Sequence, residues 1–329
     1  MEGGKELNNA LLLSSSPHIR VKDTTQRIMI DVVIALVPAI ISGIYFFGPR
    51  ILAVIFTTVI SCVISEYTAR KVMKRDITIS DFSAVVTGVL LALNLPPAIP
   101  LWIAAIGGAI AIIIIKQMFG GIGQNFMNPA LGARIILLLS WTQQMTNWIN
   151  PKAPDVISSA TPLIFLKKGQ EIMEGINKPP YVEFFLGHAV GSIGETSVLA
   201  LLLGGAYLLY RKVISPAIPL SFIASVALFS WVFGGSTPFT GDFLYHVLAG
   251  GITLGAFFMA TDYSTSPVTT KGKIIMGIGC GVITTVIRLY ANYPEGVSFA
   301  IILMNIFVPL IDKYTIPKSF GFGGESKVG

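Results

Sequence analysis

Long runs of apolar residues dominate the chain, and short polar intervals separate them. Because a bilayer core requires about 20 apolar residues per helix, we interpret ten of these runs as membrane spans. The spans are residues 28–47, 50–67, 82–95, 98–117, 125–142, 195–211, 215–234, 243–261, 272–290 and 296–312. The pattern predicts an all-α polytopic membrane protein of about ten transmembrane helices.

Basic residues gather in alternate intervals between these spans. With the N-terminus inside, the inner segments hold Arg20, Lys22, Arg27, Arg70, Lys71, Lys74, Arg75, Lys116, Arg211, Lys212, Lys271, Lys273, Lys313, Lys318 and Lys327. The short outer loops hold only Arg50 as a basic residue. Since basic loops stay in the cytoplasm, we predict that both termini are cytoplasmic and that the polar interval 143–194 lies outside.

The two halves of the chain are weakly similar to each other. Residues 87–97 resemble residues 252–262, at an offset of roughly 167–170 residues. Five spans per half would invert the second copy, as in many transporters. The predicted organisation is 1–27 cytoplasmic segment, 28–142 first five-helix repeat, 143–194 outer loop, 195–313 second five-helix repeat and 314–329 cytoplasmic tail. Gly and Pro at 95–97, 119–129 and 187–197 predict broken helices, whose freed backbone groups require partners.

The composition agrees with a membrane protein. The 329 residues are 53% hydrophobic and 12% charged, whereas soluble domains carry about 25% charged residues. The net charge of +6 does not indicate nucleic acid, because the basic residues lie in loops that set orientation. Cys62 and Cys280 are too few for an iron–sulfur cluster, and His18, His188 and His246 show no paired spacing. We therefore expect no metal site.

One hydroxyl stands out in the outer interval, at residues 155–163. Pro162 disfavours the α region for Thr161, which should therefore be extended on a turn. Small neighbours at Ser158, Ser159 and Ala160 leave the Thr161 hydroxyl open. Taken alone, the stretch fits either a plain turn or a modification site.

Charged residues also lie near the ends of the predicted spans. They are Asp31, Asp81, Arg134, Asp262, Arg288, Glu295 and Asp312. A charge at the bilayer centre costs about 2.5–3.5 kcal/mol, so these groups should face the protein interior or water. Asp262 and Asp312 fall at inner ends and Glu295 at an outer end. Carboxylates at opposite faces suit passage of a cation, but interfacial anchoring and helix pairing explain them equally well.

A set of motifs between residues 17 and 320 resembles the D subunit of the Rnf complexes and, more distantly, the B subunit of the sodium-pumping NADH:quinone reductases. The motifs are residues 119–130, 155–163, 191–197, 258–262 with 265–267, and 293–296. Taken together they are highly specific. The resemblance implies a membrane flavoprotein subunit of a complex that couples ferredoxin and NAD⁺ to movement of Na⁺ or H⁺, in a bacterial or archaeal cytoplasmic membrane.

The same resemblance implies a covalent FMN, esterified through its phosphate to Thr161 by a flavin transferase. Asp155, Ser158, Ser159 and Ala160 belong to the modified motif, although Ser159 stands where the family has Gly. It also implies an ion path, with Asp262, Glu295 and Asp312 as candidate carboxylates. A second, non-covalent flavin such as riboflavin between the repeats is implied by the quinone-reductase relatives.

Two other functions fit the residues without the resemblance. Broken helices and an internal repeat would suit a cofactor-free secondary transporter or channel. A structural scaffold for a membrane complex is the third possibility. Covalent attachment of a flavin would distinguish the flavoprotein subunit from both of these alternatives.

Overall fold

The computed structural model describes residues 24–150, 153–158, 180–187, 190–235, 237–291 and 295–317. In the N-terminal half, α1 (Thr25–Phe47), α2 (Arg50–Val72) and α3 (Ser83–Leu93) precede α4 (Leu101–Ala109), which continues as the π-helix η2 (Ile110–Gln117). The half ends with α5 (Pro129–Ser140) and α6 (Thr142–Met145). A 3₁₀ turn, η1 (Ile79–Asp81), precedes α3.

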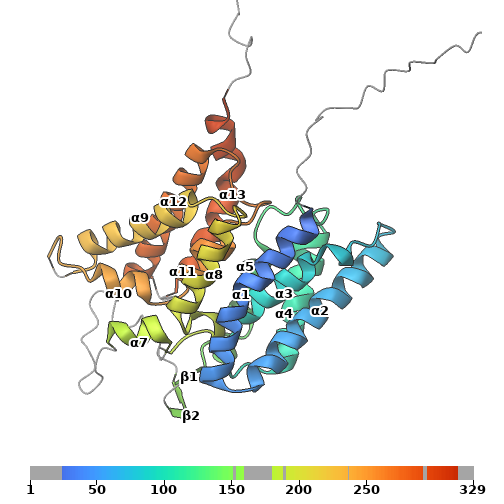
Figure 1. Cartoon of the computed structure of the whole chain (residues 1–329), viewed down its shortest axis with the longest axis horizontal. Coiled ribbons are helices and arrows are strands. Elements are labelled where there is room, and N and C mark those ends of the chain that lie inside the picture. Colours follow the sequence, from blue (N-terminus) through green and yellow to red (C-terminus); the bar gives the residue numbers. More distant parts are fainter. Residues whose placement is uncertain are drawn as a thin grey trace, which may run out of the picture.

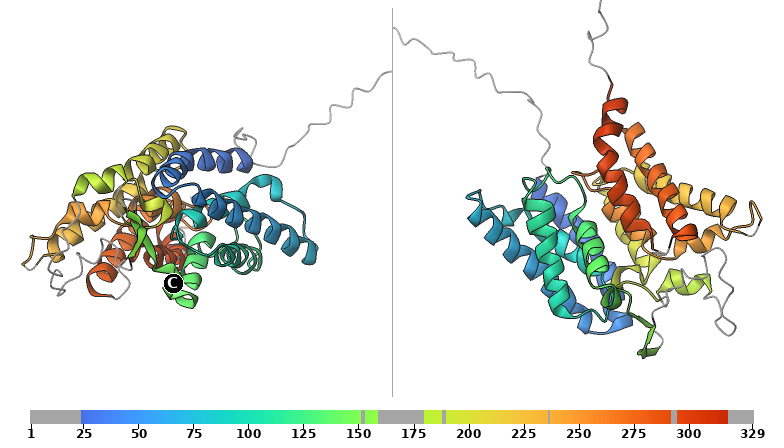
Figure 2. Two further views of the ribbon diagram at one scale, coloured as in Figure 1. Left: turned by 90° about the horizontal axis from the view of Figure 1, so that it is seen from below. Right: turned by 180° about the vertical axis from the view of Figure 1, so that it is seen from behind.

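The C-terminal half follows a similar order of elements. It contains α8 (Val198–Tyr210), α9 (Ala217–Phe233), α10 (Phe243–Leu248), α11 (Ile252–Leu254), the π-helix η5 (Gly255–Met259), α12 (Thr270–Tyr290) and α13 (Val297–Thr315). The two halves lie side by side (Figure 2). Between them in sequence come β1 (Trp148–Asn150), β2 (Ala153–Ser158), α7 (Tyr181–Leu186) and the 3₁₀ turn η4 (Ile193–Glu195).

Helix lengths identify a multi-pass membrane protein. Among the described residues, four helices are long and apolar enough to cross a membrane: α1, α2, α12 and α13. Shorter apolar helices are Ser83–Leu93, Leu101–Gln117, Pro129–Ser140, Val198–Tyr210 and Ala217–Phe233. Every predicted span therefore contains helix, but the run 243–261 is divided into α10, α11 and η5. Gly250, whose φ of 72° is in the left-handed region, marks the division between α10 and α11.

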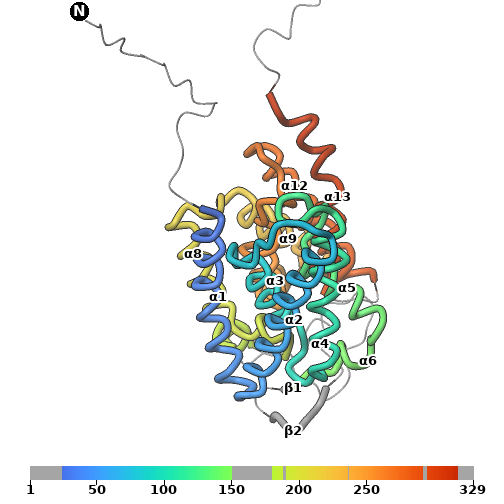
Figure 3. Tube along the Cα trace, turned by 90° about the vertical axis from the view of Figure 1, so that its right-hand side faces the viewer, coloured from blue at the N-terminus to red at the C-terminus, as the bar shows by residue number. Residues whose placement is uncertain are grey.

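The helix ends define two ends of the molecule. α1 begins and α13 ends at one end, and β1 and β2 lie at the other (Figures 1 and 3). The first, called the basic end below, carries basic residues in terminal turns of α2, η2 and α13, which are Arg70, Lys71, Lys116 and Lys313. The β1–β2 pair is antiparallel, with Trp148 opposite Ser158, and the apolar pattern of the sequence does not predict it.

The halves pack through close helix contacts. α1 lies against α8, and α5 lies against α13. Within the C-terminal half, α9 and α13 each pack on α12. Gly204 of α8 lies close against α1, because a Cβ added there would lie 2.0 Å from the Ala35 carbonyl oxygen. One buried apolar cluster extends through both halves and includes Leu36, Leu93 and Leu254.

Candidate functional site

A pocket lies between the two halves. Its lining comes from α1, α3, η2, the loop before α5, α8, η5 and the loop after η5. Polar members of the lining are Ser83, Thr87, Lys116, Asn125, Asn128, Thr261, Asp262 and Ser264, and apolar members include Ile122, Phe257 and Phe258. The pocket has a volume of about 80 Å³ and is open on one side.

Asp262 is the carboxylate in this pocket. It follows η5 and accepts hydrogen bonds from the hydroxyls of Ser264 (2.9 Å) and Thr265 (3.2 Å). Burial raises the pKa of the Asp262 carboxyl, and these hydrogen bonds and the nearby charge of Lys116 oppose that shift. The site thus holds a carboxyl group whose ionisation depends on the charge around it.

Asn128 joins the N-terminal half to η5 at the pocket wall. Its Oδ1 accepts from the backbone N–H groups of Ala130 (3.0 Å) and Leu131 (3.3 Å), which caps α5. Its Nδ2 donates to the Met259 carbonyl oxygen at 3.3 Å. Asn is a preferred N-cap because its side chain satisfies a free N–H group of the first turn. The residue that caps α5 therefore also forms a hydrogen bond between the two halves.

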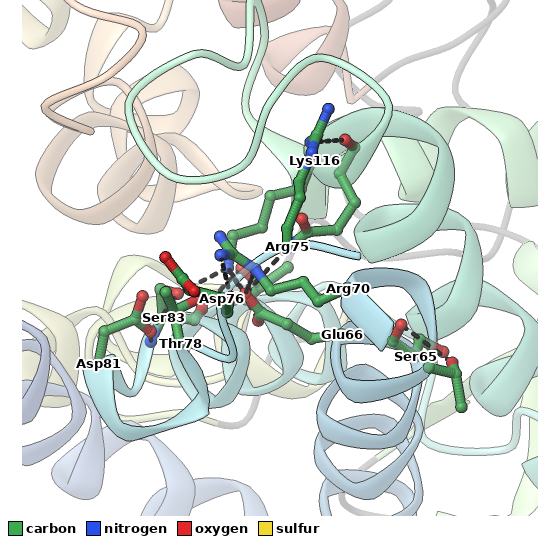
Figure 4. Close-up of polar contacts among 12 residues, drawn as sticks. Ser65, Glu66, Arg70, Arg75, Asp76, Thr78, Asp81, Ser83 and Lys116 are labelled. Atoms are coloured by element: carbon green, nitrogen blue, oxygen red, sulfur yellow. Dashed lines mark hydrogen bonds and ion pairs between the residues drawn. The ribbon is translucent and has the colours of Figure 1, made fainter. Parts of the chain in front are cut away.

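A buried ion-pair cluster lies on the N-terminal side of the pocket (Figure 4). Glu66 of α2 is 0% exposed, and Lys116 of η2 is 3% exposed. The Lys116 Nζ donates to Glu66 Oε2 at 3.0 Å, to Glu66 Oε1 at 3.2 Å and to Ser83 Oγ at 2.6 Å. Since Lys116 also lines the pocket, it connects Glu66 to the space that contains Asp262.

Glu66 has further partners at the basic end. Gln117 Nε2 donates to Glu66 Oε1 at 2.9 Å, and Arg70 Nε lies 3.7 Å from the same oxygen. Arg70 is held by its hydrogen bond to the Asp76 carbonyl oxygen at 2.7 Å. The wide turn of η2 brings the consecutive residues Lys116 and Gln117 onto one carboxylate. Stretches of π-helix are frequently found at functional sites.

A second buried charge cluster lies where α13 begins. Arg134 of α5 forms a close ion pair with Glu295 and donates to Ser298 Oγ at 2.6 Å. Its NH2 also lies 3.9 Å from Glu195 Oε1. Arg288 donates to the carbonyl oxygens of His246 (2.5 Å) and Ala249 (2.9 Å). The carboxylates of Glu195 and Glu295 thus share one guanidinium of the N-terminal half.

The predicted site residues fall in separate places. Asp262 lies in the pocket, while Glu295 pairs with Arg134 as described. Asp312 accepts from the Val268 backbone N–H at 3.1 Å and does not line the pocket. Asp155 and Ser158 belong to β2. Ser159, Ala160 and Thr161 lie outside the described residues.

Sequence reasoning misses Glu66 and the role of Lys116. Glu66 falls inside the predicted span 50–67, and the charge pattern treats Lys116 only as a residue that sets orientation. The available signal is a single carboxylate inside an apolar run with Arg70 at i+4, since a charge within a span usually faces the protein interior. Among the described residues, no group of three or more His, Cys, Asp or Glu side chains could hold a metal ion.

Fold and buried charges together define a multi-pass membrane protein with ionisable groups inside its helical body. Residues 12–321 match the family described as NQR2, RnfD, RnfE. The chain belongs to this family, which confirms the resemblance found in its motifs.

Several relatives match over nearly the whole chain. One is the D subunit of the Na⁺-translocating ferredoxin:NAD⁺ oxidoreductase complex of Acetobacterium woodii, 49% identical over 318 residues, covering 96% of each chain. The proton-translocating counterpart of Clostridium ljungdahlii is 47% identical and covers 95% of this chain and 97% of the relative. The D subunit of the ion-translocating oxidoreductase complex of Cellvibrio japonicus is 38% identical, with 95% of each chain covered.

Proposed function

We propose that this protein is the D subunit of an Rnf-type ion-translocating ferredoxin:NAD⁺ oxidoreductase, which relays electrons through an FMN bound covalently to Thr161 and contributes to a path for Na⁺ or H⁺. The observation that carries this proposal is the similarity to two ferredoxin:NAD⁺ oxidoreductase subunits over at least 95% of the chain. Its partners are the other subunits of the complex and the flavin transferase that attaches FMN.

The architecture of the proposal is two inverted repeats of five spans. Helices in corresponding positions begin at Arg50 and Ala217, at Ser83 and Ile252, at Leu101 and Thr270, and at Pro129 and Val297. The second member of each pair follows the first by 167 to 169 residues. α1 runs away from the basic end, whereas α8 runs towards it (Figure 1). These spacings and directions support inversion of the second copy.

The proposed orientation places the basic end in the cytoplasm, since basic loops are retained there. Both termini would then be cytoplasmic, because α1 begins and α13 ends at that end (Figure 3). The β1–β2 pair lies at the opposite end, and Thr161 follows β2 by three residues. This arrangement supports an outer location for the flavin-bearing loop.

FMN attached at Thr161 would supply one- and two-electron chemistry. The protein's part would be to hold the cofactor by its phosphate ester, so that the cofactor is not lost to the medium. Asp155 and Ser158 lie in β2, which fixes the start of the modified motif.

The pocket between the halves is the candidate place for the second flavin. Its walls are mainly apolar with a few polar side chains, as in most cofactor sites. Ligand pockets commonly measure roughly 300–1,000 Å³, and this one has a volume of about 80 Å³. A flavin would therefore extend out of the pocket through its open side. Asn125, Thr87 and Lys116 would face the flavin with hydrogen-bonding groups, and Phe257 would supply an aromatic surface.

The ion path of the proposal runs between the two charge clusters. Asp262 in the pocket, with Glu66 behind Lys116, would serve the cytoplasmic side. Glu295, held by Arg134, would serve the outer side. Asp312 would act on the cytoplasmic side through the loop that it holds at Val268. Ionisable residues at membrane depth commonly mark ion pathways.

Flavin attachment is tested by in-gel fluorescence of the denatured protein, expressed together with a flavin transferase. A fluorescent band is expected for the wild type and is lost in Thr161→Ala, while Ser159→Ala, which removes a neighbouring hydroxyl, keeps it. An unlabelled wild-type protein from the native host would favour a cofactor-free transporter instead.

The ion path is tested separately from the flavin. Asp262→Asn and Asp312→Asn should lower ion-coupled turnover of the assembled complex while leaving the fluorescent band intact. Turnover equal to that of the wild type would remove the substituted carboxylate from the path.

A further inference from the structure

A second cavity lies at the basic end, where α8 ends and where α9 and α12 begin. It has a volume of about 230 Å³. Its charged lining residues are Lys212, which follows α8, and Lys273 in the first turn of α12. Ser215, Ser266, Thr261 and Tyr263 contribute hydroxyl groups. Among the described residues, the lining includes no Asp or Glu.

The two lysines give this cavity a positive charge. In the part of the chain that the structure describes, neither lysine ammonium takes part in a hydrogen bond or an ion pair. The basic residue next to Lys212 differs, because Arg211 pairs with Asp31 at 3.1 Å. The nearest lining carboxylate of the neighbouring pocket, Asp262, is engaged by Ser264 and Thr265. Two positive charges therefore line one cavity without a partner among the described residues.

The cavity also offers a hydroxyl donor. Ser215 Oγ accepts from the Ala217 backbone N–H at 3.4 Å, which leaves its own hydrogen to donate. Tyr263 uses its hydroxyl to bond the Val213 carbonyl oxygen, and this bond fixes the loop between α8 and α9. Ammonium and hydroxyl groups around one space are the donors that bind phosphate oxygens.

The backbone at Lys212 supports a binding role for this side chain. Lys212 has a φ of 56°, in the left-handed region, and the Val213 N–H bonds the Leu208 carbonyl oxygen at 2.9 Å. This is the helix ending at which glycine is usual. A lysine there is strained relative to glycine, yet it places a second ammonium opposite Lys273.

We propose that this cavity binds a phosphate group and that its ligand is the head group of an anionic phospholipid. A volume of 230 Å³ is below the roughly 300–1,000 Å³ of pockets that enclose whole ligands, so it suits a head group whose chains remain outside. Exposed apolar residues at the same helix ends, Tyr210 (85%) and Leu220 (64%), provide a surface for those chains. Basic pockets between helices on the cytoplasmic side commonly bind anionic head groups.

The test uses the assembled complex, freed of lipid in detergent and titrated with phosphatidylglycerol or with phosphatidylcholine of the same chains. Native mass spectrometry measures the lipid that remains bound. Phosphatidylglycerol should bind more tightly, and Lys212→Met and Lys273→Met should each weaken it about five-fold, or about 25-fold together. Lys271→Met, two residues from Lys273 but outside the lining, is the matched control and should bind as the wild type does.

A third arm adds inorganic phosphate as a competitor. If phosphate displaces the lipid only at high concentration, the ligand is the lipid head group. If phosphate binds tightly and the two lysine variants abolish that binding, the ligand is free phosphate and the lipid assignment is overturned. Equal binding of both lipids, or loss in Lys271→Met equal to that in Lys273→Met, would overturn the site. Should the double variant not assemble, Lys273→Arg replaces it and should retain binding.

Discussion

At the scale of single residues, the buried pair of Glu66 and Lys116 makes a sharp prediction. Lys116→Met removes the ammonium that lies 3.0 Å from Glu66 Oε2 and leaves a buried carboxylate. Breaking one side of a buried ion pair costs about 3–5 kcal/mol. We expect the lower end of that range, because Arg70 and Gln117 remain beside Glu66. The unfolding midpoint of the purified protein in detergent measures the loss.

The matched control for this pair removes both charges. Glu66→Gln with Lys116→Met leaves no uncompensated carboxylate, so the double variant should unfold at a higher denaturant concentration than Lys116→Met alone. A double variant less stable than the single one would show that Lys116 contributes mainly by packing.

The carboxyl of Asp262 predicts a pH dependence. Burial raises its pKa, and hydrogen bonds from Ser264 and Thr265 partly oppose this. At low pH the wild-type group is protonated and resembles Asn, whereas at high pH it carries a charge that Asn lacks. The effect of Asp262→Asn on ion-coupled turnover should therefore grow as pH rises. Turnover measured across pH gives the ratio of wild type to variant, and a constant ratio would contradict a role for the charge.

Ser264→Ala provides the companion measurement for Asp262. Loss of the 2.9 Å hydrogen bond removes an interaction that stabilises the charged carboxylate. The pKa of Asp262 should rise further, which moves the pH profile of turnover to higher pH. Thr261→Val, which removes the adjacent hydroxyl that donates to the Phe257 carbonyl oxygen at 2.7 Å, should leave the profile in place.

At the scale of helices, the contact between α1 and α8 tests the packing of the two halves. A Cβ at Gly204 would lie 2.0 Å from the Ala35 carbonyl oxygen, so Gly204→Ala must push the helices apart. Overpacking of this kind costs about 1–3 kcal/mol. Leu203→Ala is the control, since Leu203 is 58% exposed on the same helix and should have little effect. The midpoint of thermal unfolding is measured for both variants and should be lower for Gly204→Ala. Equal midpoints would contradict a close contact at Gly204.

The hydrophobic runs predict where helices occur, but they do not predict where those helices are interrupted. The ten runs each contain helix, because apolar length alone indicates a span. The π-helices η2 and η5 are not predictable, since their extra residue per turn leaves the apolar pattern unchanged. Helix α5 starts at Pro129 instead of 125 because Asn128 caps it. The apolar run 125–142 does not indicate this start, whereas the Gly and Pro residues at 119–129 do. The division of the run 243–261 follows from Gly250 and Gly251, which that run also contains.

At the scale of the whole molecule, the candidate site is assembled from segments far apart in the chain. Lys116 and Asp262 line one pocket although 146 residues separate them. The sequence predicts that Asp262 lies at the end of a span. It does not predict that Asp262 shares a pocket with Lys116, because that depends on how the two halves pack. Asn128 is a second example. Its role as the cap of α5 can be predicted from neighbouring residues, whereas its hydrogen bond to Met259 in the other half cannot.

The orientation of the whole molecule leads to the last prediction. Single cysteines at Asp76 and Val268 would report the basic end, and cysteines at Gln143 and Thr240 would report the other end in each half. All four positions are exposed, and the native Cys62 and Cys280 are buried, so labelling should report the new thiol. In intact cells, a membrane-impermeant maleimide should label Gln143→Cys and Thr240→Cys, but Asp76→Cys and Val268→Cys only after permeabilisation. An inverted repeat requires this labelling pattern in both halves. If Val268→Cys were labelled in intact cells and Thr240→Cys only after permeabilisation, the inverted repeat would be refuted, while the orientation of the N-terminal half would still hold.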